Sequence, residues 1–140
     1  MSQVNDFNAR TIAEFRANAG RVGGSFAGAP LLLLHSIGAR SGEPRVHPVM
    51  YLAEGDRYIV FASKAGAPTN PDWYHNLKAH PDATIEVGST TVAVTAAEVT
   101  GPDRDAMFTR WVARNPGFGE YQAKTSRIIP VIALTRRAEA

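Results

Sequence analysis

The 140-residue sequence contains no cysteine, which excludes disulfide bonds, thiolate metal sites and a cysteine nucleophile. Its histidines match neither H-x-x-x-H nor H-E-x-x-H, the spacings that bring two imidazoles to one face of a helix. The patterns G-x-G-x-x-G and G-x-x-x-x-G-K-[ST] are also absent from the sequence. We therefore expect no metal ion and no Rossmann or P-loop nucleotide site.

The sequence also lacks long apolar segments. Its longest apolar run is far too short to span a bilayer, and the first six residues show neither the basic nor the apolar region of a signal peptide. We therefore expect a cytoplasmic protein. The net charge of +2 is too small for a dedicated nucleic-acid binder, and aromatic residues do not alternate with basic ones along a strand, so no nucleic-acid partner is predicted.

A chain of this length with 44% hydrophobic and 20% charged residues is typical of a single globular domain, here spanning the whole sequence. Residues 5–18 are predicted to form a helix with Phe7, Ile12 and Phe15 roughly on one face, followed by a glycine-rich linker at residues 20–30. We expect this short apolar stripe to pack on the body of the protein. The alternative is peripheral contact with a membrane surface.

Segments beyond residue 30 that are rich in valine, isoleucine, threonine and aromatic residues are typical of short strands. They are Leu31–Ser36, Val46–Ala53, Tyr58–Ala62, Thr84–Val87, Thr90–Val99 and Ile128–Leu134. Their close spacing, with turn residues between several of them, predicts a mainly β fold with flanking helices. We expect one barrel of about six antiparallel strands, and not a sandwich of many strands.

Two further helices are predicted among these strands. Asn70 precedes Pro71 as a capping side chain before a proline at the first helical position, so a helix is expected over residues 71–79. A second helix is expected from about residue 102 to residue 115. Tyr121 lies in a short helical stretch that follows this second helix.

The most distinctive loop runs from Gly38 to Arg45, with the sequence G-A-R-S-G-E-P-R, between the first two predicted strands. Its guanidinium groups, on Arg40 and Arg45, offer forked donors to a phosphate or a carboxylate. The glycine and serine residues make the loop tight, and we expect them to leave backbone N–H groups accessible to an anion. The alternative is an ordinary surface hairpin with solvated arginines.

A second loop, from Ser63 to Pro71, follows the third predicted strand and precedes a helix. The hydroxyl of Ser63, the ammonium of Lys64 and the exposed N–H groups at the start of the helix converge there, which is typical of an anion site. Trp73 and Leu77, four residues apart, are expected to dock the helix on the core. The alternative is that Lys64 is simply solvated.

Three motifs occur in the order G-x-R-S-G-x-P-R, A-S-K-x-G-x-P-x-x-P-x-W-Y-x-N-L-x-x-x-P and Y-Q-x-K-T-x-R-x-I-P-V. Together they closely resemble the deazaflavin-dependent nitroreductase family, over roughly residues 31–135. Members of that family are split β-barrel enzymes that use the reduced deazaflavin coenzyme F(420). The resemblance implies a redox enzyme whose coenzyme passes hydride and carries a phosphodiester and an oligoglutamate tail.

The resemblance also implies a set of cofactor-binding residues. The two loops would hold the anionic tail, and the strand backbone at Pro48, Val49 and Met50 would flank the ring. The full set is Arg40, Ser41, Arg45, Pro48, Val49, Met50, Ala62, Ser63, Lys64, Gly66, Trp73 and Asn76. Flavin mononucleotide (FMN) is the less favoured cofactor, because cations spread over two loops suit a long anionic tail better than one terminal phosphate.

The resemblance also implies that the late segment of the chain contacts the electron acceptor. Tyr121 matches one of several tyrosines that line the family's substrate pocket and is the predicted catalytic residue, whereas Phe118 and Asn115 replace others. Phe118 and Tyr121 are the predicted substrate-binding residues, and a quinone or a nitroaromatic compound is the expected acceptor. Ala39 stands where close relatives often have a further basic residue, so the tail is expected to be held less tightly.

Other functions stay open at this point. An FMN-dependent reductase would use the same barrel with a different cofactor. A flavin- or deazaflavin-binding protein without turnover would use the same binding residues and need no acceptor site. Both a monomer and a homodimer are compatible with the sequence.

Overall fold

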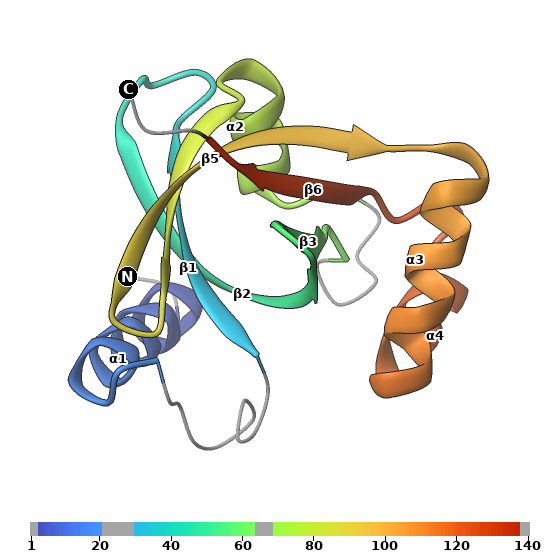
Figure 1. The fold of residues 1–140 in the computed structure, drawn as a ribbon, viewed down its shortest axis with the longest axis horizontal. Helices are drawn as coiled ribbons and strands as arrows, with labels where there is room; N and C mark the ends of the chain where they lie inside the picture. The colour runs from blue at the N-terminus through green and yellow to red at the C-terminus, as the bar shows by residue number, and fades with distance from the viewer. Residues whose placement is uncertain (1–2, 21–29, 64–68, 138–140) are drawn as a thin grey trace.

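The structure, a computed structural model, describes residues 3–20, 30–63 and 69–137, with the side chains of the first helix described from residue 9 onward. In this part of the chain, six strands form a closed barrel in the order β1-β2-β3-β6-β5-β4, and all neighbouring pairs are antiparallel (Figure 1). The strands are β1 (Leu31–Ile37), β2 (Pro44–Glu54), β3 (Arg57–Phe61), β4 (Asp82–Val87), β5 (Thr90–Val99) and β6 (Val131–Arg136). The predicted antiparallel barrel with flanking helices is confirmed.

The last strand begins later than the sequence predicts. The prediction was residues 128–134, whereas β6 spans Val131–Arg136; the other described strands end within two residues of their predicted bounds. Pro130 has no N–H group to donate to a strand ladder. The N–H of Ile129 donates instead to Oε1 of Gln122 at 3.0 Å. The predicted start is wrong because tertiary hydrogen bonds occupy the backbone there.

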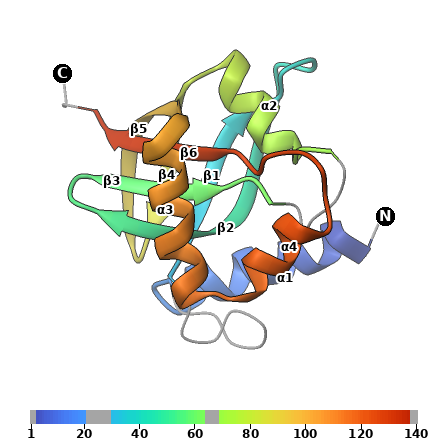
Figure 2. The ribbon, with the colours of Figure 1, turned by 90° about the vertical axis from the view of Figure 1, so that its right-hand side faces the viewer.

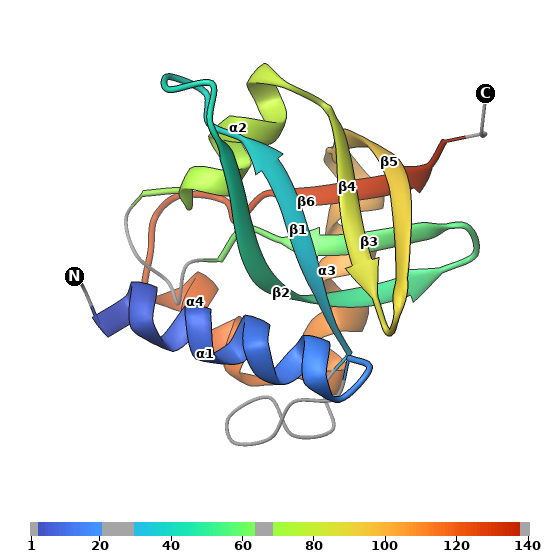
Figure 3. The same cartoon turned by 90° about the vertical axis from the view of Figure 1, so that its left-hand side faces the viewer.

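Both faces of β1 are buried, which explains its run of consecutive leucines. Leu32 and Leu34 join the core inside the barrel, whereas Leu31 and Leu33 lie on the outer face. The first helix, α1 (Gln3–Ala17), covers that outer face, where Phe15 is completely buried (Figure 3). A strand that is covered on both sides needs apolar residues at successive positions and not at alternate ones.

Polar contacts also hold α1 on the barrel. The guanidinium of Arg16 donates to both carboxylate oxygens of Glu86 on β4, at 3.2 and 2.8 Å, and Nε2 of His35 lies 2.5 Å from one of these oxygens. Just beyond the helix, Gly20 has a φ of 93° and lies so close to the β4–β5 turn that a Cβ would be 2.8 Å from Cα of Gly88. The expected packing of this helix on the barrel is confirmed.

The described residues do not support contact of α1 with a membrane, and they include only the two ends of the predicted linker. No helix in the described part of the chain is long and apolar enough to cross a membrane. Contact of α1 with a membrane surface gains no support, because its described apolar side chains pack on the barrel. The predicted linker at residues 20–30 lies, apart from its two ends, outside the described residues.

Two further helices, α3 (Gly101–Arg114) and α4 (Gly117–Ala123), cover another part of the barrel's outer face (Figure 2). Aromatic rings fill this contact. Phe61 of β3 stacks on Trp111 with ring centroids 4.7 Å apart, and Phe118 lies edge-on to Trp111 at 5.2 Å. Such pairs add to the free energy gained by burying apolar area. The predicted helix at residues 102–115 and the short helical stretch that carries Tyr121 are confirmed.

The remaining helix, α2 (Asp72–Ala79), lies at one end of the barrel, where Trp73 and Leu77 reach the interior core as predicted. Its predicted cap is wrong. Pro71 itself occupies the N-cap position, and no side chain caps the helix. The amide oxygen of Asn70 instead accepts an N–H from Arg127 at 2.7 Å. A charged donor from a distant segment therefore takes the oxygen that would have capped the helix.

We expect Glu86→Gln to lower the free energy of unfolding by about 1 kcal/mol at neutral pH, since Arg16 is half exposed and water screens the pair. The hydrogen bond from Arg16 lowers the pKa of Glu86, burial opposes this, and the bond from His35 adds to it. The stabilisation is therefore present above the ordinary pKa of 4.5 and is lost as the pH falls through the lowered value. Urea unfolding at neutral pH and across the acid range measures it.

The matched control is Glu43→Gln. Glu43 pairs with Arg45 at 3.3 Å, but 67% of its side chain is exposed. We expect this substitution to change the free energy of unfolding by no more than a few tenths of a kcal/mol. Equal effects of the two substitutions, or a Glu86 effect that does not depend on pH, would contradict the role of this ion pair in holding α1.

Candidate functional site

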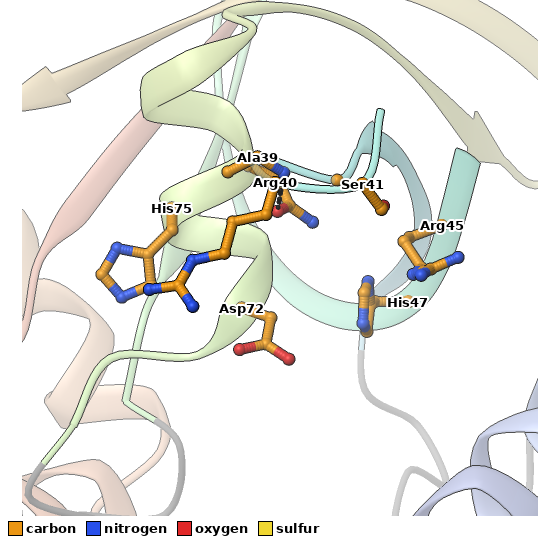
Figure 4. Close-up of a pocket in the computed structure, with 9 residues that line it drawn as sticks. Ala39, Arg40, Ser41, Arg45, His47, Asp72 and His75 are labelled. Carbon is orange, nitrogen blue, oxygen red and sulfur yellow. Dashed lines mark hydrogen bonds between the residues drawn. The ribbon is translucent and has the colours of Figure 1, made fainter. Parts of the chain in front are cut away.

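A cavity of about 730 Å³ lies between the β1–β2 loop and one face of α2 (Figure 4). Strand alternation places its β2 residues on one face of that strand, and the spacing of i, i+3 and i+4 places its α2 residues on one face of that helix. Among the described residues, the lining consists of Gly38, Ala39, Arg40, Ser41, Arg45, His47, Asp72, His75 and Asn76. Two segments that are distant in the sequence thus form one polar cavity.

The two predicted arginines come from different parts of this cavity. In Figure 4, Arg40 extends from the loop toward the α2 side, while Arg45 lies beside His47 on β2. Nη1 of Arg45 donates to Glu43 at 3.3 Å, and 48% of the Arg45 side chain is exposed. Arg40 is also exposed. Both guanidinium groups can therefore donate to a ligand that enters the cavity.

The β1–β2 loop is closed by its own hydrogen bonds. The N–H of Gly38 donates to the carbonyl of Glu43 at 2.8 Å, and the N–H of Gly42, with a φ of 70°, donates to the carbonyl of Gly38 at 2.9 Å. The N–H of Glu43 donates to Oγ of Ser41 at 3.2 Å. The expectation that the loop leaves its backbone N–H groups accessible to an anion is wrong at these positions, because the loop itself uses them.

Asn76 fixes this loop against α2. Its side chain is 5% exposed; its Oδ1 accepts the N–H of Ala39 at 2.9 Å, and its Nδ2 donates to Oγ of Ser36 at 3.2 Å. A buried amide that lost either partner would keep an unsatisfied polar group away from water, which is costly. Asn76 thus lines the cavity and positions the β1–β2 loop, since both its side-chain oxygen and its side-chain nitrogen are hydrogen-bonded.

His47, Asp72 and His75 line the cavity but are missing from the predicted set. Burial lowers the pKa of His47, the charge of Asp72 opposes this, and the charge of Arg45 adds to it. Nδ1 of His47 is buried and has no hydrogen-bond partner in the described part of the chain. The alternation of β2, read from Arg45, and the helical spacing of α2, read from Asn76, would have identified all three residues.

The second predicted loop is described only at its ends, since Lys64 and Gly66 lie outside the described residues. Ala62 and Ser63 are buried at the end of β3. Their carbonyls accept N–H groups of Arg127 at 3.1 and 2.7 Å. Arg127 stands in the third sequence motif, yet no local pattern indicates which segment it contacts.

The other predicted cofactor residues lie outside the cavity lining. Val49 and Trp73 belong to the interior core and are less than one-tenth exposed. Alternation along β2 puts Pro48 and Met50 on the other face of the strand. Met50 contacts both the core under α1 and the core under α3. β2 therefore runs from the cavity, at Arg45, to the two outer cores, at Met50.

The predicted substrate residues form an aromatic row on α4 and beneath it. The ring centroids of Phe118 and Tyr121 are 5.1 Å apart, and the row continues through Trp111 to Phe61. Phe118 and Tyr121 are half-buried and pack on the core under α3. Asn115 caps the end of α3 and donates its side-chain amide to the main-chain carbonyl of Trp111 at 3.3 Å.

Known proteins are similar to this one in sequence and structure over most of its length. The model of the F(420)H(2)-dependent quinone reductase family matches residues 8–136. An F(420)H(2)-dependent quinone reductase of Mycobacterium tuberculosis is 46% identical over 129 residues, which cover 89% of this chain and 87% of that protein. The solved structure of an F(420)H(2)-dependent reductase is 38% identical, with a TM-score of 0.68, and the match covers 75% of this chain and 93% of that one. A structure described as a domain-swapped dimer is 34% identical, with a TM-score of 0.70, over 90% and 92% of the two chains.

The match of the family model extends from α1 to β6 and includes the segments that carry all three sequence motifs. Together, the matches confirm the resemblance to deazaflavin-dependent enzymes and the split-barrel fold. The chain belongs to the F(420)H(2)-dependent quinone reductase family, whose cofactor is coenzyme F(420).

Proposed function

We propose that the protein transfers hydride from reduced coenzyme F(420) to a quinone, with the coenzyme's anionic tail in the cavity and the acceptor beside the aromatic row of α4. Family membership supports the coenzyme and the reaction. The observation that carries the placement of the site is the course of β2. This strand begins at the arginine-lined cavity and brings Met50 against the core that holds Tyr121.

The chemistry of the cavity lining fits an anionic ligand. The guanidinium groups of Arg40 and Arg45 each offer N–H donors in a planar fork that matches a phosphate or a carboxylate. Asp72 contributes a negative charge, which the two arginines exceed. His47 adds a ring nitrogen without a partner among the described residues. The phosphodiester and the carboxylates of the tail would be held by Arg40 and Arg45.

The length of β2 fits an elongated coenzyme. The step from Arg45 to Met50 spans about 17 Å at the rise per residue of a strand. A ligand with its anionic end at Arg45 could span this distance to the level of Met50, whose side chain projects from the opposite face of β2. Pro48 and Met50 would lie along the ring, whereas Val49 would contribute backbone alone, since its side chain is buried in the barrel.

The role of the second loop, residues 63–71, is proposed from the family resemblance. Ser63, Lys64 and Gly66 are proposed as further contacts with the coenzyme. Ala62 and Trp73 would support them from the interior, where both are buried. A tail that touched both loops would use more cations than a single terminal phosphate can, and this favours F(420) over FMN.

The coenzyme supplies a hydride, and a quinone becomes a hydroquinone when it gains that hydride and one proton. The chain orients the acceptor and provides a polar contact for its oxygen. The rings of Phe118 and Tyr121 offer a flat surface on which a quinone can stack. The phenol of Tyr121 can donate a hydrogen bond to the quinone oxygen as negative charge develops there. A nitro oxygen can accept the same bond, so nitroaromatic compounds are the second expected class of acceptor.

Fluorescence titration with F(420) and with FMN tests this assignment. We expect the protein to bind F(420) more tightly. Arg40→Ala and Arg45→Ala should each weaken the binding of F(420) by about 1–3 kcal/mol, because each removes charge-assisted hydrogen bonds to the tail. Oxidation of F(420)H(2) by a quinone, followed by absorbance, then distinguishes an enzyme from a protein that binds the coenzyme without turnover.

Arg57→Ala is the matched control for these titrations. Arg57 lies in the β2–β3 hairpin, pairs with Glu54 at 3.1 Å and does not line the cavity. Its loss removes the same charge and should leave the affinity for F(420) unchanged. Binding of FMN as tight as that of F(420), or tighter, would contradict the assignment of F(420) as the cofactor. Unaltered F(420) affinity in both cavity variants would show that the tail lies elsewhere.

Tyr121→Phe tests the acceptor side. If its hydroxyl stabilises the transition state, turnover falls about 10-fold or more, while the affinity for F(420) and the melting temperature hold. Tyr74→Phe is the comparison, because the Tyr74 hydroxyl donates to Glu98 at 2.8 Å and joins α2 to β5. That variant should lose about 1 kcal/mol of stability with normal turnover. If Tyr121→Phe behaved like Tyr74→Phe, the hydroxyl of Tyr121 would contribute to stability and not to turnover.

A further inference from the structure

Arg127 joins parts of the chain that are far apart in the sequence. Its Nη1 donates to the carbonyl of Ala62 at 3.1 Å and to Oδ1 of Asn70 at 2.7 Å, and its Nη2 donates to the carbonyl of Ser63 at 2.7 Å. Ala62 and Ser63 follow β3, and Asn70 precedes α2. One guanidinium therefore fixes the chain both where it leaves the barrel and where it enters the helix.

These bonds form in a partly buried place. Burial lowers the pKa of Arg127, although a guanidinium stays charged at any ordinary pH. Hydrogen bonds from a charged donor to shielded carbonyls are strong, and the planar fork gives them direction. A lysine at this position would keep the charge but would lose the fork, so it could not satisfy the same acceptors.

Arg127 is itself held by α3 and α4. Nε2 of Gln122 donates to the carbonyl of Arg127 at 2.7 Å, and Oε1 of Gln122 accepts the N–H of Ile129 at 3.0 Å. Arg104 of α3 donates to the carbonyl of Ile129 at 3.2 and 2.7 Å. Gln122 follows Tyr121 directly in α4. The helix that carries the proposed acceptor residue therefore also fixes the backbone of Arg127.

We infer that Arg127 is a positioning residue for the coenzyme site. It does not line the cavity, but it binds Asn70, two residues before Asp72, whose side chain does. α2 forms one wall of the cavity through Asp72, His75 and Asn76, and the bond to Asn70 fixes the place where this wall begins. The inference rests on the proposed placement of the coenzyme's tail in this cavity.

The first test is F(420) titration of Arg127→Lys beside Arg137→Lys. Arg137 is a matched control, since its guanidinium also donates to main-chain carbonyls, those of Val94 and Ala83 at 3.2 and 3.4 Å, and it does not line the cavity. We expect Arg127→Lys to raise the Kd for F(420) roughly 10-fold, and Arg137→Lys to leave it within about twofold of the wild-type value. An unchanged Kd in Arg127→Lys would overturn the inference.

The second test needs no coenzyme. Hydrogen exchange of the ligand-free proteins should show faster exchange in Arg127→Lys than in the wild type at the amide of Tyr74, which donates to the carbonyl of Pro71 at 3.1 Å, and at the amides that follow it in α2, with no such change in Arg137→Lys. Urea unfolding of each variant corrects for any change in global stability. Protection of α2 equal to the wild type would overturn the inference, because Arg127 would then not hold the start of that helix.

The two tests separate this inference from the proposed function. If the wild type fails to bind F(420), the proposed function fails, while hydrogen exchange still decides whether Arg127 fixes α2. If Arg127→Lys does not fold, Asn70→Ala replaces it, because this variant removes one acceptor and keeps the bonds to Ala62 and Ser63. We then expect a roughly 3-fold higher Kd with faster exchange at the start of α2. A variant at Asn70 that changed neither would overturn the inference.

Discussion

Burial of both faces of β1 is the constraint on which the rest of the structure depends. Leu32 and Leu34 help to fill the barrel, and Leu31 and Leu33 require α1 as an outer cover. A small barrel filled by side chains has no room for a ligand inside it. Groups that bind a ligand must therefore lie at its rim or on its outer face. The arginine-lined cavity lies at the rim, and the aromatic row of α4 lies on the outer face.

Arginine has two separate uses in this molecule. Arg104, Arg127 and Arg137 donate to main-chain carbonyls and join segments that are distant in the sequence. Arg40, on the β1–β2 loop, and Arg45, at the start of β2, are exposed to water and line the cavity. Placing a charge out of water is costly unless several hydrogen bonds compensate, and the first group makes those bonds within the protein. Composition alone could not separate the two groups, because the residue type is the same.

Local patterns were sufficient for most of the fold and for part of the site. Alternation and turn residues located the strands, and the order of the motifs located the arginine loop. The prediction is wrong where the hydrogen-bond partner is distant in the sequence. The side-chain oxygen of Asn70 accepts a hydrogen bond from Arg127 and does not cap α2. The acceptors of Arg127 lie up to 65 residues away in the sequence. His47, Asp72 and His75 were different, because strand and helix periodicity already placed them beside the predicted residues. Asp72 and His75 occupy unspecified positions of the second motif, and His47 lies two residues beyond the first motif, so the resemblance does not assign them.

In the proposed function, binding and hydride transfer take place at two different points along one strand, its start and its middle. The tail would be held at Arg40 and Arg45, and the ring would lie near Met50, about 17 Å along β2. Binding energy gained at a distant anion can orient the reacting ring without placing a fixed charge beside it. Met50, Phe118 and Tyr121 pack on one apolar core, and in the proposed function this less polar surrounding would strengthen a hydrogen bond from Tyr121 to the acceptor. A closed barrel suits this arrangement because both neighbours of β2 hold it in register, so the distance along β2 between Arg45 and Met50 is fixed by the fold.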